Sequence, residues 1–243
     1  MIPPRERLIV ALDVSSAKEA RKIVSSLGDA VQIYKVGMQL YTAEGPQVVR
    51  DLVASGRRVF LDLKYHDIPN TVAAAVREAA QLGVSMLTVH AFGGTKMLHA
   101  TVEAAREKES GLQVLGVTVL TSMNDQDLNE TGVKGLVVDQ VVRLASLALE
   151  AGCAGVVSSA REVKTLRAKL GSDFLVVTPG VRPAGSAHGD QARVATPAEA
   201  IAAGATHVVV GRPITAAANP AAEAAKILQD LGTRRSELET QNV

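Results

Sequence analysis

The chain has 243 residues, of which 47% are hydrophobic and 21% charged, and this is the size and composition of one globular domain with its own core. Its 26 basic and 25 acidic residues leave a formal net charge of +1, which argues against nucleic acid as a partner. Aromatic residues make up only 2%, and Cys153 is the single cysteine, so the chain lacks base-stacking platforms, a disulfide framework and a four-cysteine zinc site.

The N-terminal segment and the hydropathy pattern give no sign of export or membrane insertion. Residues 1–7 contain charges and prolines, unlike a signal peptide, and every apolar run stops well short of the ~20 residues that cross a bilayer. Together with the single cysteine, these features predict a soluble protein of the reducing cytoplasm with no membrane partner.

Short apolar runs rich in β-branched residues alternate along the chain with stretches of helical periodicity. We expect eight strands, at residues 8–14, 31–36, 58–63, 85–91, 113–120, 154–158, 174–178 and 206–210. The clearest helices are expected at residues 17–27, 71–82, 135–151 and 160–170, and a glycine follows each of them, as is common where a helix stops.

Eight strand–helix units in a chain close to ~250 residues predict a single (β/α)8 barrel, the TIM barrel, over residues 1–243. The alternative is an open doubly wound sheet. Against it, the first strand is followed by Asp13-Val-Ser-Ser-Ala and not by the Gly-x-Gly-x-x-Gly turn of dinucleotide-binding sheets. The polar tail at residues 233–243 has little to bury, and we expect it to fray.

Charged residues gather where the first three strands end, which is the active-site end of a barrel. Asp13 follows the first strand, Lys35 lies in the second, and the third contains Asp62 and Lys64. Because they are two residues apart on a strand, Asp62 and Lys64 should both face the barrel interior, where charges must pair. A purely structural ion pair is the alternative, but three inward charges favour a functional site because their burial is unfavourable in a core.

Asp67 comes three residues after Lys64 and directly precedes the start of a helix at Ile68-Pro69-Asn70-Thr71. This position suits a helix-capping carboxylate as well as a site residue, and the sequence pattern leaves both interpretations open. His66 is expected to be a loop residue, because no second histidine stands at metal-ligand spacing. We therefore predict no metal site.

Two late segments predict a site for an anionic ligand. Residues 179–197 form a connection far longer than usual, with three glycines and the donors Arg182 and Gln191. This connection is interpreted as a lid over the ligand, with a disordered surface insertion as the alternative. Gly211 and Arg212 follow the last strand, where barrels commonly bind phosphate. The ligand is therefore expected to be phosphorylated.

These motifs resemble those of the orotidine 5′-monophosphate decarboxylase family over essentially the whole chain. The core Asp62-Leu-Lys64-Tyr-His-Asp67 also occurs in the related keto-gulonate-phosphate decarboxylases and hexulose-phosphate synthases, but its extension to Thr71 favours the orotidine enzymes. The same family is favoured by Ala11-Leu-Asp13, Tyr34-Lys35-Val-Gly37, Val119-Leu-Thr121-Ser122, Pro179-Gly-Val-Arg182 with Gln191, and Gly211-Arg212-Pro213.

The resemblance implies conversion of orotidine 5′-monophosphate to uridine 5′-monophosphate and CO2, the last step of pyrimidine synthesis, without metal or organic cofactor. It implies that Lys64 stabilises and protonates a carbanion at C6, with Asp62 beside the departing carboxylate and Lys35 and Asp67 completing a charged array. It also implies a homodimer with shared sites, in which Asp67 and Thr71 reach the ribose across the interface. The remaining implied contacts are Asp13 and Lys35 to ribose, Thr121 or Ser122 to the base, and Arg182, Gln191, Gly211 and Arg212 to phosphate.

Two alternatives to this function stay open. A Mg2+-dependent phosphosugar decarboxylase or aldolase of the same barrel group would share Asp62, Lys64 and Asp67, but its turnover would stop in the presence of a chelator. A barrel that only binds a nucleotide would be favoured by the loss of a charge among Lys35, Asp62 and Lys64, and all three charges are present.

Overall fold

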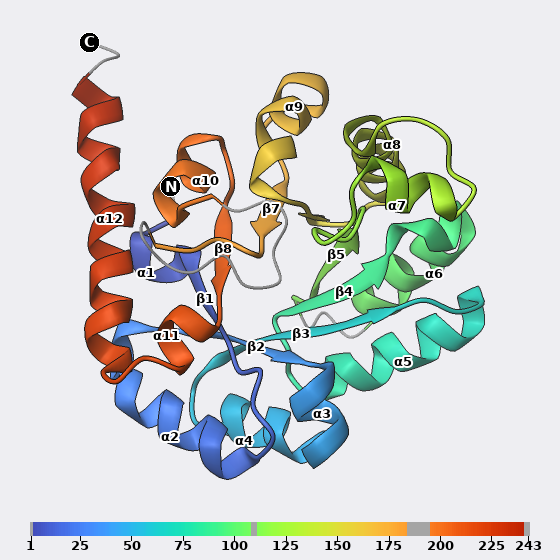
Figure 1. Ribbon diagram of the computed structural model, residues 1–243. Helices are drawn as coiled ribbons and strands as arrows, with labels where there is room; N and C mark the ends of the chain where they lie inside the picture. The colour runs from blue at the N-terminus through green and yellow to red at the C-terminus, as the bar shows by residue number, and fades with distance from the viewer. Residues whose placement is uncertain (1, 108–110, 184–194, 241–243) are drawn as a thin grey trace.

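The computed structural model describes residues 2–107, 111–183 and 195–240, and within them eight parallel strands close into a barrel (Figure 1). The strands follow one another in chain order, and β8 pairs with β1 to complete the ring. The predicted (β/α)8 barrel is thus confirmed. The strands are β1 Leu8–Ala11, β2 Ile33–Gly37, β3 Arg58–Tyr65, β4 Met86–His90, β5 Gln113–Val117, β6 Gly155–Val157, β7 Leu175–Thr178 and β8 His207–Val210.

All eight predicted strands are present, although several end earlier than predicted. The apolar run after β1 continues through Leu12, and the run after β5 through Val119; both side chains are buried outside the strands. The hydropathy pattern reports burial, whereas a strand requires backbone pairing, and this difference explains the shorter strands.

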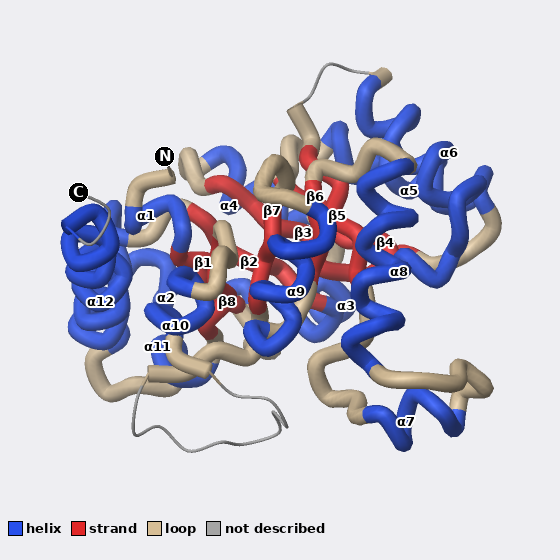
Figure 2. Tube along the Cα trace, turned by 90° about the horizontal axis from the view of Figure 1, so that it is seen from above, coloured by secondary structure: helices blue, strands red, loops and turns tan. Residues whose placement is uncertain are grey.

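The helices surround the strands (Figure 2). The predicted helices at residues 17–27 and 160–170 have the expected bounds, whereas the connection between β2 and β3 holds two helices that were not predicted separately. Gly45, with φ of 65°, and Pro46 separate those two helices, α3 and α4. The helices are α1 Pro4–Arg7, α2 Ala17–Leu27, α3 Met38–Glu44, α4 Gln47–Ala54, α5 Pro69–Gln81, α6 Gly94–Arg106, α7 Asp125–Glu130, α8 Val137–Glu150, α9 Ala160–Leu170, α10 Pro197–Ala202, α11 Arg212–Thr215 and α12 Pro220–Thr240.

Two hydrophobic cores hold the barrel together. The larger core lies between the strands and the surrounding helices, and the smaller one fills the barrel interior. Because the strands are covered on both faces, they read as nearly continuous apolar runs in the sequence. The interior core consists of Ile9, Ala11, Ile33, Phe60, Met86, Leu115, Val177 and Val209. This apolar plug forms the floor beneath any site at the mouth of the barrel.

The pairing of β3 with β4 contains an irregularity close to the mouth. Leu61 pairs with Leu87 and Tyr65 with Val89, so three residues of β3 lie opposite Thr88 alone. Lys64, inside this bulge, has a φ of 52° and is the one non-glycine with positive φ among the described residues. Bulges often occur beside active sites, where they redirect a side chain.

In the part of the chain that the structure describes, no helix has both the length and the apolar character needed to cross a bilayer.

Helix α12 packs against α1, α2 and α10 along the side of the barrel, as Figure 1 shows. The fraying of residues 233–243 stays a prediction, as does the treatment of residues 1–243 as one domain.

Candidate active site

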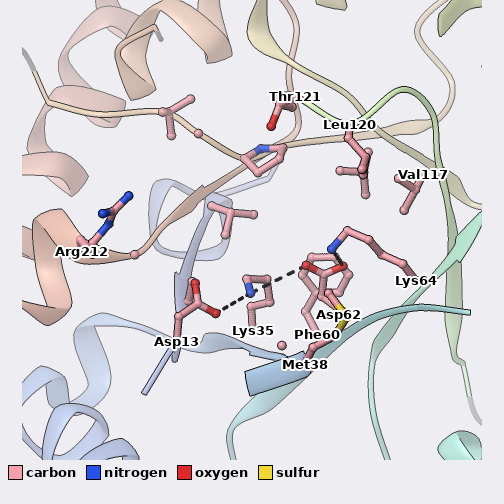
Figure 3. A pocket seen from close by; sticks show the side chains of 18 of the residues that line it. Asp13, Lys35, Met38, Phe60, Asp62, Lys64, Val117, Leu120, Thr121 and Arg212 are labelled. Atoms are coloured by element: carbon pink, nitrogen blue, oxygen red, sulfur yellow. Dashed lines mark hydrogen bonds and ion pairs between the residues drawn. The ribbon is translucent and has the colours of Figure 1, made fainter. Parts of the chain in front are cut away.

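A pocket of about 600 Å³ opens at the carboxyl ends of the barrel strands (Figure 3). This volume suits a nucleotide-sized ligand. Its inner wall is apolar, and charged side chains stand above that wall. The apolar lining includes Ala11, Phe60, Val117, Val157 and Val209.

Four charged side chains of alternating sign run across the pocket. The Lys35 Nζ donates a hydrogen bond to Asp13 Oδ1 at 2.9 Å and lies 3.7 Å from Asp62 Oδ2. The Lys64 Nζ donates to Asp62 Oδ1 at 2.9 Å. The side chains of Lys35 and Asp62 are only 11% and 14% exposed, so each requires the partners that the structure gives it. The predicted mutual pairing of Lys35, Asp62 and Lys64 is confirmed.

The register of the first three strands brings this array together. Lys35 lies level with Ala11 of β1 and Phe60 of β3, and Gly37 lies level with Asp62. A Cβ at position 37 would stand 2.8 Å from Lys35 Nζ and 3.2 Å from Asp13 Oδ1. The glycine therefore leaves room for the ion pair. Its role was not predicted from the sequence, although it closes the motif Tyr34-Lys35-Val-Gly37.

The other end of the pocket is formed by the connections after β7 and β8. Arg182 and Arg212 both line the pocket, and Figure 3 shows Arg212 on the far side of Asp13 from Asp62 and Lys64. A Cβ at Gly211 would make only ordinary contacts, 3.5 Å from Ala11 Cβ and 3.8 Å from Asp13 Oδ2. Packing within the chain therefore does not demand glycine there, and Gly211 lines the pocket.

Most of the predicted site residues with described placements line this pocket. Thr121 belongs to the lining, whereas the neighbouring Ser122 is exposed and outside it. Gln191 lies outside the described residues. Residues that sequence reasoning missed include Phe60, beneath Asp62 on β3, and Met38, at the start of α3.

Asp67 and Thr71 are exposed and do not line the pocket of their own chain. Helix α5 begins after Ile68, which has no side-chain cap, and the Asp67 carboxylate accepts a hydrogen bond from the adjacent Ile68 N–H at 2.6 Å. The helix-capping interpretation of Asp67 is therefore wrong. Its side chain stands beyond the strand end and faces solvent.

Two histidines stack at the edge of the site. The rings of His66 and His90 lie 5.3 Å apart, and Phe92 lies 5.5 Å beyond His90. Burial lowers the pKa of His90 to about 4, and its electrostatic interactions with His66 and Lys64 act in the same direction. His90 is thus neutral at physiological pH. Among the described residues, no three His, Cys, Asp or Glu side chains gather as a metal site.

An eight-stranded parallel barrel with a charged pocket at its strand ends defines a (β/α)8-barrel enzyme. Within that class, the model of the "Orotidine 5'-phosphate decarboxylase / HUMPS family" matches residues 6–227, and the chain belongs to this family.

Individual relatives agree with the family match. The chain is 50% identical over 226 residues to the orotidine 5'-phosphate decarboxylase of Idiomarina loihiensis, covering 93% of this chain and 98% of the relative. It is 51% identical over 230 residues to that of Halorhodospira halophila, covering 95% and 98%. The crystal structure of the Lactobacillus acidophilus orotidine 5'-phosphate decarboxylase superposes with a TM-score of 0.81 at 39% identity, covering 92% of this chain and 98% of that one.

Proposed function

We propose that the pocket converts orotidine 5′-monophosphate to uridine 5′-monophosphate and CO2 by means of the array Asp13–Lys35–Asp62–Lys64. The alternating array is the observation that carries the proposal, because it holds an ammonium group, with fixed neighbours, above an apolar floor. Family membership and full-length relatives of about 50% identity support the same reaction.

The order of groups along the pocket matches the order of groups in a nucleoside monophosphate. Arg182 and Arg212 occupy one end and bind the phosphate together with Gly211. Asp13 and Lys35 lie between that end and Asp62, and they bind the ribose hydroxyls. The base then lies beside Asp62 and Lys64, with Thr121 as its polar contact. Gln191 is expected to share the phosphate.

The chemistry follows from the position of the ammonium group. When the bond from C6 to the carboxylate breaks, CO2 leaves and the electron pair stays at C6, in the ring plane, where the π system cannot delocalise it. Stabilisation must therefore come from a charge fixed in advance. The Lys64 ammonium provides that charge and then donates its proton to C6, and water reprotonates the lysine. Asp62 holds Lys64 in place and lies next to the departing carboxylate.

The test is the ultraviolet absorbance change of orotidine 5′-monophosphate with purified protein, wild type and Lys64→Ala, in the presence of EDTA. We expect wild-type turnover to persist with the chelator and Lys64→Ala to lose at least ~10³-fold in kcat while it remains folded. Near-normal turnover by folded Lys64→Ala would refute the role of Lys64. Loss of wild-type turnover in EDTA would favour the Mg2+-dependent phosphosugar alternative.

We further propose that two copies of the chain form an isologous dimer, in which Asp67 and Thr71 complete the partner's site. Large hydrophobic side chains are exposed on four consecutive connections of the barrel mouth: Met38 at 57%, Ile68 at 67%, Phe92 at 39% and Leu120 at 38%. Such an apolar cluster favours a protein interface. Asp67 and Thr71 lie on the same side of the mouth, next to Ile68 and outside their own pocket.

Mixing two inactive variants tests the shared site. If Lys64→Ala and Asp67→Ala are each inactive, a mixed dimer has one site with both lesions and one with neither. Random assortment at equal amounts makes about half the dimers mixed, so activity should return to about a quarter of wild type. If mixed dimers form and activity stays absent, Asp67 acts within its own chain.

A cytoplasmic location stays a prediction. It is supported by the single cysteine, Cys153, which is buried and unpaired by disulfide. Burial raises the pKa of its thiol to about 12, which makes it unreactive.

A further inference from the structure

Thr88 is a fully buried polar residue directly beneath the charged array, and no proposed step uses it so far. It lies on β4 between Leu87 and Val89 and has no exposed surface. Its hydroxyl oxygen accepts a hydrogen bond from the Lys64 backbone N–H at 2.9 Å. The same hydroxyl donates to Asp62 Oδ1 at 3.0 Å. One side chain therefore contacts both residues of the proposed reacting pair.

The hydrogen bond to the Lys64 backbone lies within the bulge of β3 and replaces a missing strand-pairing contact. Three residues of β3 stand opposite Thr88, so regular backbone pairing cannot continue through this stretch. The Thr88 side chain gives the Lys64 N–H a partner within the bulge. Lys64 has a φ of 52°, a conformation that a side chain bearing a Cβ adopts only at a cost of about 1 kcal/mol or more. The hydrogen bond helps to hold that conformation.

The contact with Asp62 fixes the direction of the carboxylate. A threonine hydroxyl has one proton to donate. The Thr88 oxygen accepts a hydrogen bond from the Lys64 N–H, so its own proton is available for the hydrogen bond to Asp62 Oδ1. The same Oδ1 also accepts from Lys64 Nζ, while Oδ2 faces Lys35. Thr88 thus fixes the rotamer of Asp62 from below, and Asp62 in turn fixes the Lys64 ammonium.

We propose that Thr88 is a positioning residue for the decarboxylation, holding the Lys64 backbone and the Asp62 carboxylate in their reactive geometry through one hydroxyl. The inference rests on the proposed roles of Lys64 and Asp62. Thr88 does not line the pocket, so it acts through these two residues and not on the substrate. Its loss therefore lowers turnover without weakening substrate binding.

The experiment compares Thr88→Val, Thr88→Ala and Thr88→Ser with wild type. The first two remove the hydroxyl, and the alanine and serine variants differ from each other by that one oxygen. A matched control is Thr118→Val, because Thr118 is also fully buried and its hydroxyl donates to the Val157 carbonyl at 2.9 Å, outside the charged array. For each variant, kcat and KM are measured with orotidine 5′-monophosphate, and the melting temperature is recorded.

We expect Thr88→Val and Thr88→Ala to lose about 10- to 100-fold in kcat, the effect of one hydrogen bond to a charged group, with KM within about twofold of wild type. Thr88→Ser should restore most of kcat, and Thr118→Val should keep the wild-type kcat. Unchanged kcat in folded Thr88→Ala, a loss confined to KM, or a serine variant as impaired as the alanine variant would each overturn the proposal.

Two further outcomes separate a role in folding, or a failure of the proposed mechanism, from the positioning role of Thr88. If both Thr88→Val and Thr88→Ala fail to fold while Thr118→Val folds, the hydroxyl is required for the fold, and the positioning role is refuted. Lys64→Ala, measured alongside, separates this proposal from the one it rests on. An active Lys64→Ala refutes the proposed mechanism itself, whereas an inactive Lys64→Ala with a fully active Thr88→Ala refutes only the role of Thr88.

Discussion

Substitution of Gly37 by alanine places one methyl group against the middle of the charged array. The added Cβ would lie 2.8 Å from Lys35 Nζ, where a relaxed contact requires about 3.5 Å. The ammonium must therefore move by somewhat less than ~1 Å, away from its 2.9 Å hydrogen bond with Asp13. Gly37 has a φ of −98°, which alanine adopts without strain, so the fold itself accepts the change.

The magnitude follows from the hydrogen bond that is disturbed. A hydrogen bond to a charged group contributes ~1.5–3 kcal/mol, which corresponds to a loss of about 10- to 100-fold in kcat/KM if the substrate needs Lys35 where the structure places it. The same hydrogen bond also stabilises the folded chain, so the melting temperature should fall by about 3–12 °C. Turnover is therefore compared at a temperature at which the thermal melt shows both proteins to be folded.

The assay is orotidine 5′-monophosphate turnover by ultraviolet absorbance, together with a thermal melt. Gly232→Ala on α12 is the control, because a Cβ there meets no atom within 4 Å. We expect the control to keep wild-type activity. If Gly37→Ala turns over substrate as fast as wild type, the geometry of Lys35 is not critical, and the reasoning fails.

Three further predictions test other parts of the molecule. Arg212→Ala should lower kcat/KM by ~10²-fold or more, with partial rescue by added guanidinium, and an unchanged value would contradict the phosphate role. Burial lowers the pKa of His207 from 6.5 to about 4. Between pH 6.5 and pH 4 the imidazole is therefore protonated in the unfolded chain but not in the folded one. As the pH falls through this range, the free energy of unfolding of the wild type should decrease by up to ~3 kcal/mol. The free energy of unfolding of His207→Gln, measured by urea denaturation, should lack this decrease. If wild type and variant lose stability equally between pH 6.5 and pH 4, His207 is not its source. A Cβ at Gly155 would overlap the Leu175 carbonyl oxygen, so Gly155→Ala should lower stability by ~3 kcal/mol or more, and an unchanged melting temperature would refute the close approach of β6 and β7.

The strands and most of the charged array could be predicted because both depend on local patterns. Nearly continuous apolar runs give the strands, and Asp62 and Lys64, two residues apart, were correctly predicted to face the same side. The backbone between these two residues was not predicted. Strand β3 bulges here and Lys64 has a positive φ, whereas the prediction assumed a regular strand with alternating side chains.

The remaining features depend on contacts between distant parts of the chain. In the sequence, Thr88 is indistinguishable from any other strand residue. Only the register of β3 against β4 brings its hydroxyl to Asp62, 26 positions away. Gly37 likewise matters because of the space that Lys35 and Asp13 occupy. The predicted partner contacts of Asp67 and Thr71 involve a second copy of the chain, so a single chain can only place them at the surface.

The left-handed backbone of Lys64 also sets a limit on how stable this barrel can become. Glycine, or to a lesser degree asparagine, would relieve the unfavourable conformation at position 64, and either change would remove the ammonium group. Under the proposed role of Lys64, selection for activity and selection for stability therefore act in opposite directions on this one residue. In a descendant that no longer needs the reaction, position 64 would be free to change, and glycine there would relieve the backbone conformation at the expense of the ion pair with Asp62. The same residue is the one to leave untouched when a consensus or thermostabilising design is applied to the rest of the barrel.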